Sequence, residues 1–185
     1  MREDFAVFIL SHGRADNVKT FKTLKKQGYT GKIYIVIDDE DEQEPLYYKK
    51  YGEQVYKFCK QTYIDTTDTM CSEEFRKVVV YARNAAWDIA ADLGLTYFCV
   101  LDDDYTMFEN RYIEGRKLKT YKFQNLDKVF DSFLQFLDVS KSITVCMAQG
   151  GDFIGGSKSG TFRKGLLRKA MNVWFCRTDR PFKFM

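Results

Sequence analysis

Three consecutive aspartates, Asp102, Asp103 and Asp104, directly follow the apolar run Tyr97 to Leu101. A buried strand that runs into three carboxylates concentrates negative charge at one edge of a sheet. Such repulsion is relieved where the groups splay into water, meet cations or hold a metal. Oxygen ligands alone suit Mg²⁺ or Mn²⁺, ions that usually bridge to substrate phosphates. We therefore expect a divalent-metal site here, and a solvated turn with a helix-capping aspartate is the alternative.

Short apolar runs alternate with amphipathic stretches in the part of the chain before the aspartates. The first three elements have the spacing of a right-handed parallel crossover, with Asp16 as the expected N-cap of the helix and Gly28 closing it. Open α/β sheets bind ligands at the carboxyl ends of their strands, and the aspartates fall at that edge. We expect strands at 5–10, 32–37, 54–59 and 96–101, helices at 17–27, 45–51 and 73–93, the last capped by Ser72, and a loop at 61–70.

The pattern changes beyond Met107. Residues 111–122 read as a hairpin that turns at Glu114-Gly115. Asn125 is the expected N-cap of an amphipathic helix over 126–137. The side chains expected to face inward from this helix are Val129, Phe130, Phe133, Phe136 and Leu137.

Two more buried strands are expected at 142–148 and 171–176, with a glycine-rich stretch at 149–160 between them. This stretch lacks the spacing of a phosphate-binding loop. It is either a flexible loop or a ligand lid. Basic residues cluster from Arg163 to Lys183, and this face either meets phosphates or is an ordinary solvated helix surface.

A chain of 185 residues forms one domain with an ample core. We divide this domain, 1–185, into a nucleotide-binding half at 1–107 and an acceptor-side half at 108–185. The second half is short and stops without a terminating loop, which suggests a truncated domain or a short variant. The net charge of +3 gives no electrostatic argument for nucleic-acid binding by itself.

The five cysteines are widely spaced and form no C-x-x-C pair, as is typical of reduced thiols in a cytoplasmic protein. His12 is the single histidine, so a histidine-rich metal site is excluded. We find no signal peptide and no apolar stretch of transmembrane length. The expected location is therefore the cytoplasm, without a membrane partner.

Polar residues from three places should converge at the sheet edge. They are the turn Ser11 to Arg14, the pair Asp38 and Asp39, and the helix pair Arg83 and Asn84 beside the three aspartates. A nucleotide diphosphate needs a carboxylate or amide to contact its base, an arginine for phosphate and a bridging divalent ion. Arg83 and Asn84 stand among small apolar residues, so a charged pair there needs a partner.

Four further segments carry a resemblance: Val100–Tyr105, Phe123–Asp127, Gln149–Asp152 and Cys176–Phe182. With the sets above, they resemble GT-A glycosyltransferases, whose D-x-D motif the aspartates look like. More narrowly they resemble the TET/JBP-associated glycosyltransferases, mostly phage and bacterial enzymes inferred to place sugars on hydroxymethylated pyrimidines in DNA. The resemblance spans nearly the whole chain. It implies an α/β, GT-A-like (Rossmann-like) three-layer α/β/α sandwich with a mostly parallel central sheet and a small hairpin after the D-x-D motif.

The resemblance also implies roles for individual residues on the donor side. The donor would be a nucleotide-sugar, expected to be a UDP-sugar, and the cofactor Mn²⁺ or Mg²⁺, offsetting charge on the departing diphosphate. Ser11 and Arg14 would line the nucleotide pocket, and Asp38 or Asp39 would contact the uracil. Arg83 would approach the base or diphosphate, with Asn84 nearby. Asp102 and Asp103 would contact the donor, and Asp102 and Asp104 would ligate the metal.

On the acceptor side, Asp152 and Asp179 are the candidate catalytic carboxylates, because an inverting transfer needs a base near the acceptor hydroxyl. Either could instead be a turn residue, and the base could be absent from this chain. The acceptor would be modified DNA. Two alternatives remain: a nucleotidyltransferase, although the glycine-rich signature is missing after the first strand, and a non-catalytic module that binds a sugar nucleotide or a protein.

Overall fold

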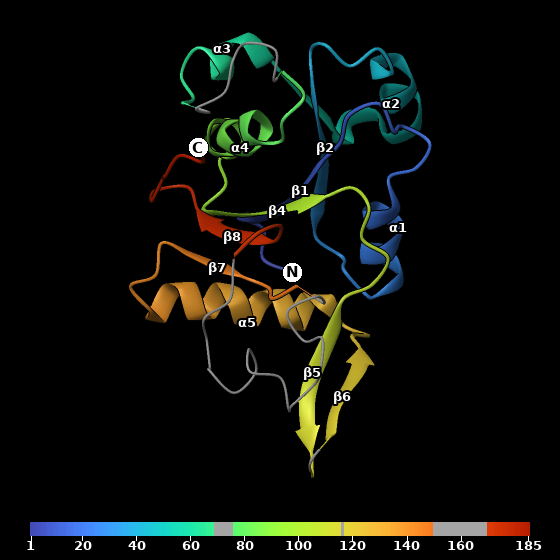
Figure 1. Ribbon diagram of the computed structural model, residues 1–185, viewed down its shortest axis with the longest axis vertical. Helices are drawn as coiled ribbons and strands as arrows, with labels where there is room; N and C mark the ends of the chain where they lie inside the picture. The colour runs from blue at the N-terminus through green and yellow to red at the C-terminus, as the bar shows by residue number, and fades with distance from the viewer. Residues whose placement is uncertain (69–75, 116, 150–169) are drawn as a thin grey trace.

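A six-stranded sheet forms the centre of the molecule (Figure 1). The computed structural model describes residues 1–68, 76–115, 117–149 and 170–185. The strands are β1 (Phe5–Leu10), β2 (Lys32–Asp38), β3 (Val55–Phe58), β4 (Tyr97–Asp102), β7 (Thr144–Cys146) and β8 (Trp174–Arg177). Their spatial order is β3-β2-β1-β4-β8-β7. The first four run parallel, whereas β8 is antiparallel to both β4 and β7.

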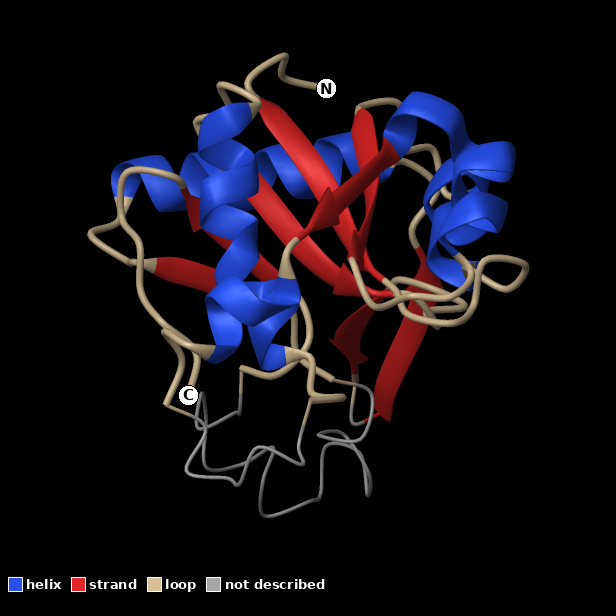
Figure 2. Ribbon diagram, turned by 90° about the horizontal axis from the view of Figure 1, so that it is seen from above, coloured by secondary structure: helices blue, strands red, loops and turns tan. Residues whose placement is uncertain are grey.

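Helices cover both faces of the sheet (Figure 2). They are α1 (Lys19–Lys26), α2 (Glu44–Tyr51), α3 (Lys60–Ile64), α4 (Val80–Asp92) and α5 (Leu126–Val139), with a 3₁₀ turn at Gly52–Gln54. Alternate residues of β1 enter two cores, Phe5 and Val7 on the side of α1, α2 and α5, Ala6 and Phe8 on the side of α4. The expected three-layer sandwich with a mostly parallel sheet is confirmed. No helix in the described ranges is long and apolar enough to cross a membrane.

A separate hairpin of β5 (Glu109–Glu114) and β6 (Lys117–Lys122) follows the aspartates. It extends away from the sheet at the lower end of the molecule in Figure 1. Gly115 lies in the turn with φ +59°, a left-handed conformation that glycine adopts without steric penalty. The hairpin predicted to turn at Glu114-Gly115 is therefore confirmed.

Two helix starts differ from the prediction. Asp16 does not cap α1, which begins at Lys19 after Val18 without a side-chain cap. A turn closed by the Asn17 N–H and the Arg14 carbonyl (2.8 Å) occupies the expected first residues of that helix. The long helix predicted from 73 starts at Val80, and Ser72 with the first residues of the prediction lies outside the described residues.

Local boundaries also differ in the loop regions. The predicted loop at 61–70 contains most of α3, which Lys60 begins. Asn125 caps α5 as predicted, because its side chain accepts a hydrogen bond from the Lys128 N–H at 3.0 Å. Phe136 was expected to face inward, but it is 52 % exposed, and Leu134 instead lies in the core, one turn after Phe130.

Candidate functional site

The carboxyl ends of β1, β2 and β4 meet at one edge of the sheet and border a cavity of about 320 Å³. The parallel register places Leu10, the last residue of β1, beside Asp102, the last residue of β4, and β2 extends two residues further, from Val36 to Asp38. Open α/β sheets bind ligands at this position. The charged and hydrogen-bonding residues that line the cavity are Ser11, His12, Arg14, Asp38, Lys60, Arg76, Lys77, Tyr81, Asp102, Asp103 and Asp104.

Asp103 points inward, and its side chain is only 8 % exposed. One carboxylate oxygen accepts a hydrogen bond from Ser11 Oγ at 2.6 Å, and the other accepts one from Arg14 Nη1 at 2.9 Å. The hydroxyl of Tyr47 lies 2.7 Å from Ser11 Oγ and accepts a bond from the Arg14 backbone N–H at 2.9 Å. Asp103 thus ties the turn after β1 to the end of β4, which is a positioning role.

The loop that carries the aspartates is anchored on α1. Thr20 donates its hydroxyl to the Asp102 carbonyl at 2.6 Å and accepts the Tyr105 N–H at 2.9 Å. Its own N–H donates to the Asp103 carbonyl at 3.1 Å. Thr20 is fully buried, so these bonds satisfy polar groups that water cannot reach. The direction of each aspartate side chain is therefore fixed by the backbone.

Asp102 faces Arg83 of α4. The closest guanidinium nitrogen lies 3.6 Å from Asp102 Oδ1, and the two side chains are 15 % and 27 % exposed. Burial raises the pKa of the Asp102 carboxyl, with Arg83 opposing that shift and Asp104 adding to it. The Nε of Arg83 is buried and has no hydrogen-bond partner among the described residues. A guanidinium in this state has unused donors for an anionic ligand.

Asp102 and Asp104 are the carboxylates of this loop that remain open to a metal ion. Within the described residues, no three Cys, His, Asp or Glu side chains converge into a ready-made metal site. Mg²⁺ and Mn²⁺ commonly use one or two protein carboxylates and complete their shell with water and substrate phosphate. The negative charge of Asp104 contributes to raising the pKa of the Asp102 carboxyl. A cation between the two carboxylates would compensate this repulsion, so the two residues fit such an ion.

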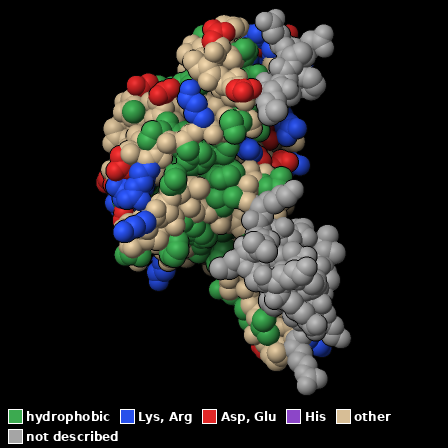
Figure 3. All heavy atoms as spheres, turned by 60° about the vertical axis from the view of Figure 1, so that its left-hand side comes forward, with side chains coloured by type: hydrophobic (Ala, Val, Ile, Leu, Met, Phe, Trp, Pro, Cys, Tyr) green, Lys and Arg blue, Asp and Glu red, His purple; other side chains and the backbone are tan. Residues whose placement is uncertain are grey.

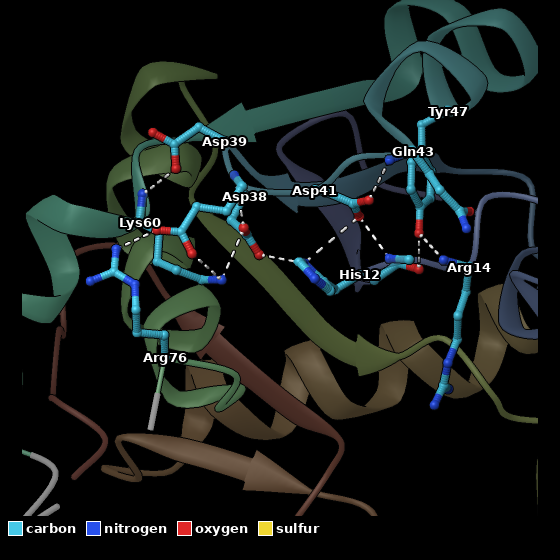
Figure 4. Close-up of polar contacts among 12 residues, drawn as sticks. His12, Arg14, Asp38, Asp39, Asp41, Gln43, Tyr47, Lys60 and Arg76 are labelled. Atoms are coloured by element: carbon cyan, nitrogen blue, oxygen red, sulfur yellow. Dashed lines mark hydrogen bonds and ion pairs between the residues drawn. The ribbon is translucent and has the colours of Figure 1, made fainter. Parts of the chain in front are cut away.

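Asp38 lies at the end of β2 between two basic groups (Figure 4). His12 Nδ1 lies 2.9 Å from one of its oxygens, and Lys60 Nζ lies 3.0 Å from the other. The side chains of Asp38 and Lys60 are 9 % and 5 % exposed, so each compensates a charge that would be costly to bury alone. Asp38 therefore presents a paired carboxylate at the cavity wall.

Asp41 and Glu40 extend this network. Asp41 accepts hydrogen bonds from the backbone N–H groups of Gly13 at 2.8 Å and Gln43 at 2.9 Å, which joins the turns after β1 and β2. Glu40 pairs with Lys60 at 3.3 Å and with Arg76. The side chain of Arg76 is 40 % exposed, and it lines the cavity mouth with Lys77.

Asp39 and Asn84 do not line this cavity. The carboxylate of Asp39 accepts the backbone N–H of Lys60 at 2.9 Å, at the start of α3. The side-chain amide of Asn84 exchanges two hydrogen bonds with the backbone of Phe184, at 2.8 and 3.0 Å. Both residues hold neighbouring segments in place, and a contact with the donor remains a prediction for each.

Of the two predicted catalytic carboxylates, the structure describes only Asp179, which does not line the cavity. Asp152 lies outside the described residues. Asp179 follows β8, and Arg177 is paired with Tyr97, the first residue of β4. Asp179 therefore lies near the amino end of β4, the edge opposite the aspartates, where Arg177 binds it at 2.9 Å and lowers the pKa of its carboxyl.

Nearly the whole chain matches the model of one protein family. The model of the TET-Associated Glycosyltransferase family matches residues 5–185. The chain belongs to this family. No curated protein and no solved structure matches it. The suspected relationship is thus confirmed, and the cavity lies in the fold of a glycosyltransferase.

This glycosyltransferase has a second cavity, of about 550 Å³, on the other side of the aspartate loop. Asp104 lines the first cavity, whereas Tyr105, the next residue, lines the second together with Met107, Glu109 and Asn172. Among the described residues that line it, Glu109 is the one carboxylate. The loop therefore separates two spaces in which two different molecules could meet.

Several residues of the glycosyltransferase site were missed by the sequence analysis. Lys60 was placed beside a loop without a role, and the importance of Tyr47 and Arg76 was not recognised. A lysine is rarely buried unless it is paired, but burial at Lys60 depends on the packing of β3 against β2, which no local pattern reveals. His12 lies in the turn Ser11 to Arg14 that was expected at this edge, but its pairing with Asp38 was not predicted.

Proposed function

We propose that this glycosyltransferase uses Mn²⁺ or Mg²⁺ to transfer a sugar from a nucleotide-sugar, a UDP-sugar, to a hydroxyl group. We further propose that the acceptor is a hydroxymethylated pyrimidine in DNA. The observation that carries the donor site is Arg83, which does not line the cavity itself but faces Asp102, a residue that does. Its Nη2 lies 3.6 Å from Asp102 Oδ1, and its buried Nε has no hydrogen-bond partner among the described residues. Such a donor of hydrogen bonds beside metal-binding carboxylates suits a diphosphate.

The lining of the first cavity supports a nucleotide diphosphate. Its volume of about 320 Å³ falls in the range of small-molecule sites, roughly 300–1,000 Å³. Arg76 and Lys77 supply positive charge at the mouth, where phosphates would neutralise them. His12 and Asp38 supply a hydrogen-bonded polar pair for a base.

Asp102 and Asp104 would hold the divalent ion. When bound, that ion supplies Lewis-acid stabilisation of the charge on the leaving diphosphate. Arg83 would donate to the same phosphates from its buried position and, together with the ion, would favour departure of the diphosphate. Asp103 holds the aspartate loop in position, because it is hydrogen-bonded to Ser11 and Arg14 of the turn after β1.

The acceptor would enter the second cavity, across the aspartate loop. Glu109 lines this cavity with a side chain that is 25 % exposed, and it would accept the proton of the attacking hydroxyl. The Arg111 guanidinium, 4.0 Å away, would help to position that carboxylate. Asp152 is the other candidate for the same proton.

A transfer assay tests the proposal. The protein is incubated with UDP-sugars, Mn²⁺ and a duplex that contains hydroxymethylated pyrimidines, and the mass of the DNA is measured. We expect the mass of the DNA to increase by one sugar for each hydroxymethylated pyrimidine that reacts, and to stay the same with unmodified duplex. Loss of the base should reduce the rate by about 100-fold or more.

Two variants locate the base in this assay. Glu109→Gln should reduce the transfer rate and leave UDP binding unchanged, whereas Asp152→Asn should keep the transfer rate of the unmodified protein. The reverse result would assign the base to Asp152. Binding of UDP without transfer to any hydroxyl acceptor would contradict an enzymatic function and support the binding-module alternative.

A further inference from the structure

The net positive charge of the whole protein is concentrated in the hairpin. Residues 109–122 carry five Lys or Arg and two Asp or Glu. The whole chain has 29 Lys or Arg and 26 Asp or Glu, a net charge of +3. In the remainder of the chain, positive and negative side chains are therefore equal in number. Because β5 and β6 pair only with each other, this charge stands on an element that is not part of the main sheet. A concentrated charge on a projecting element attracts a polyanion.

The hairpin is firmly rooted although its outer part is exposed. Gln27, which is 6 % exposed, donates to the carbonyls of Phe108 and Phe123 at 2.8 Å each and accepts the Phe108 N–H at 2.8 Å. The Cβ of any other residue at Gly28 would lie 2.6 Å from the Gln124 carbonyl oxygen, so the root packs closely against the end of α1. The ribbon is thus held at a fixed base, beside the second cavity.

Both faces of the ribbon carry basic groups. The strand register places Lys117 and Lys119 on one face with Tyr112 and Tyr121, and places Lys122 on the other. The two tyrosine rings lie 5.9 Å apart and are 38 % and 52 % exposed. Neither Lys117 nor Lys122 forms an ion pair with a described residue, and Lys119 pairs only with the exposed Glu114. Such surface pairs are weak and exchange readily for phosphate.

We propose that the β5–β6 ribbon inserts into the major groove of the acceptor DNA duplex; this inference rests on the proposed function. Neighbouring strands lie about 4.8 Å apart, and a groove about 12 Å wide admits a two-stranded ribbon. Basic groups on both faces match the phosphate chains on both walls of that groove. A hydroxymethyl group at the position of the thymine methyl also points into the major groove, towards the ribbon and the cavity at its root.

The hairpin extends away from the sheet, as this geometry requires (Figure 1), and the described atoms at the lower end of Figure 3 taper in the same direction. With six residues in each strand, the ribbon is about 20 Å long, enough to follow the groove over several base pairs. Lys117 and Lys119 would contact phosphate, and Tyr112 and Tyr121 would lie against base edges or sugars. The donor site needs none of these residues.

Fluorescence anisotropy with a labelled 20-base-pair duplex, measured over a range of salt concentrations, tests this inference without any donor. The test variant is the triple substitution Lys117→Gln, Lys119→Gln and Lys122→Gln. Its matched control replaces the exposed Lys22, Lys25 and Lys26 of α1 by Gln. We expect the test variant to lose affinity roughly 100-fold at 0.1 M salt and to reduce the slope of log K against log salt by about 2 to 3. The control should bind as the unmodified protein does.

Several results would overturn the inference. They are equal losses in the two triple variants, an unchanged salt slope in the test variant, no duplex binding by the unmodified protein, and a loss that is seen only with single-stranded DNA. Titration of UDP with Mn²⁺ into the test variant separates the two proposals. Intact UDP binding with lost DNA binding supports the ribbon, whereas absent UDP binding in the unmodified protein contradicts the donor site alone.

Discussion

Adjacent aspartates in one loop have different tasks because their surroundings differ. Asp103 is buried and bonded through both oxygens to the turn after β1. Asp102 meets a guanidinium at a distance of 3.6 Å, too long for a strong hydrogen bond. Asp104 is exposed on the cavity side. Free carboxylate oxygens for a metal are therefore found on the first and third residues, as in the D-x-D pattern.

Substituting Asp103 should test this division. Asp103→Ala leaves Ser11 Oγ and the Arg14 guanidinium without their acceptor, and we expect the free energy of unfolding to fall by about 2 kcal/mol. Asp104→Ala removes only an exposed group and should change it by less than about 0.5 kcal/mol. Urea denaturation followed by circular dichroism measures both. Equal losses in the two variants would refute the assignment of Asp103 as the positioning residue.

At the residue scale, sequence reasoning predicted that the aspartates and Arg83 lie near one another, as they do, but it could not tell how their surroundings differ. Three neighbouring carboxylates look identical in a sequence, and only the packing of the loop on α1 decides which one turns inward. The pairing of Asp38 with Lys60 likewise joins residues from two strands whose contact is set by the sheet. Asp179 was assigned by resemblance alone, and the antiparallel direction of β8 carries it to the opposite edge.

At the scale of elements, α1 organises the loop that follows β4. Thr20, Thr23 and the C-cap residue Gln27 lie along one face of α1, and all three are buried. Thr20 bonds to the Asp102 carbonyl, Thr23 bonds to the Tyr105 carbonyl at 2.8 Å, and Gln27 holds the root of the hairpin. Through backbone carbonyls, this row of polar residues links the aspartate loop to the root of the hairpin.

Removing the last contact of this row should loosen the hairpin. Gln27→Leu leaves the buried Phe108 N–H without its acceptor and removes the side-chain donor to the Phe108 and Phe123 carbonyls, although the Phe108 carbonyl keeps the Phe123 N–H. We expect a loss of about 1–3 kcal/mol in the free energy of unfolding. Amide exchange at Phe108 should accelerate, while UDP binding stays unchanged. Gln135→Leu, on the exposed side of α5, is the control. If Phe108 exchange were the same in both variants, Gln27 would not anchor the hairpin.

The elements with a clear hydrophobic period were predicted correctly, including the parallel strands, α5 and the hairpin. The start of α4 was predicted too early, because residues 76–79 are not helical and the helix begins at Val80. The polar face of α1 could not be recognised as buried. Thr and Gln at such positions look solvent-exposed in a sequence, and their partners are backbone groups distant in the chain.

At the scale of the whole molecule, the fold places two cavities on either side of a single loop. The order β3-β2-β1-β4 brings the ends of β1 and β4 together at the first cavity, the proposed donor site. The chain then leaves the sheet, forms the hairpin and α5, and returns as β7 and β8. The second cavity is bordered by both the hairpin root and the residues before β8. Donor and acceptor would therefore approach from opposite sides of Asp104 and Tyr105.

Calorimetric titration of UDP with Mn²⁺, and again with EDTA, tests the central claim most directly. The titration is repeated with Asp104→Ala and with Asp131→Ala, a control on the far helix α5. We predict binding with Mn²⁺ that is lost in EDTA, weakened at least about tenfold in Asp104→Ala by removal of a metal ligand, and unchanged in Asp131→Ala. Equal binding with and without the metal, or no binding of UDP in either condition, would contradict a metal-dependent nucleotide-sugar site at this edge of the sheet.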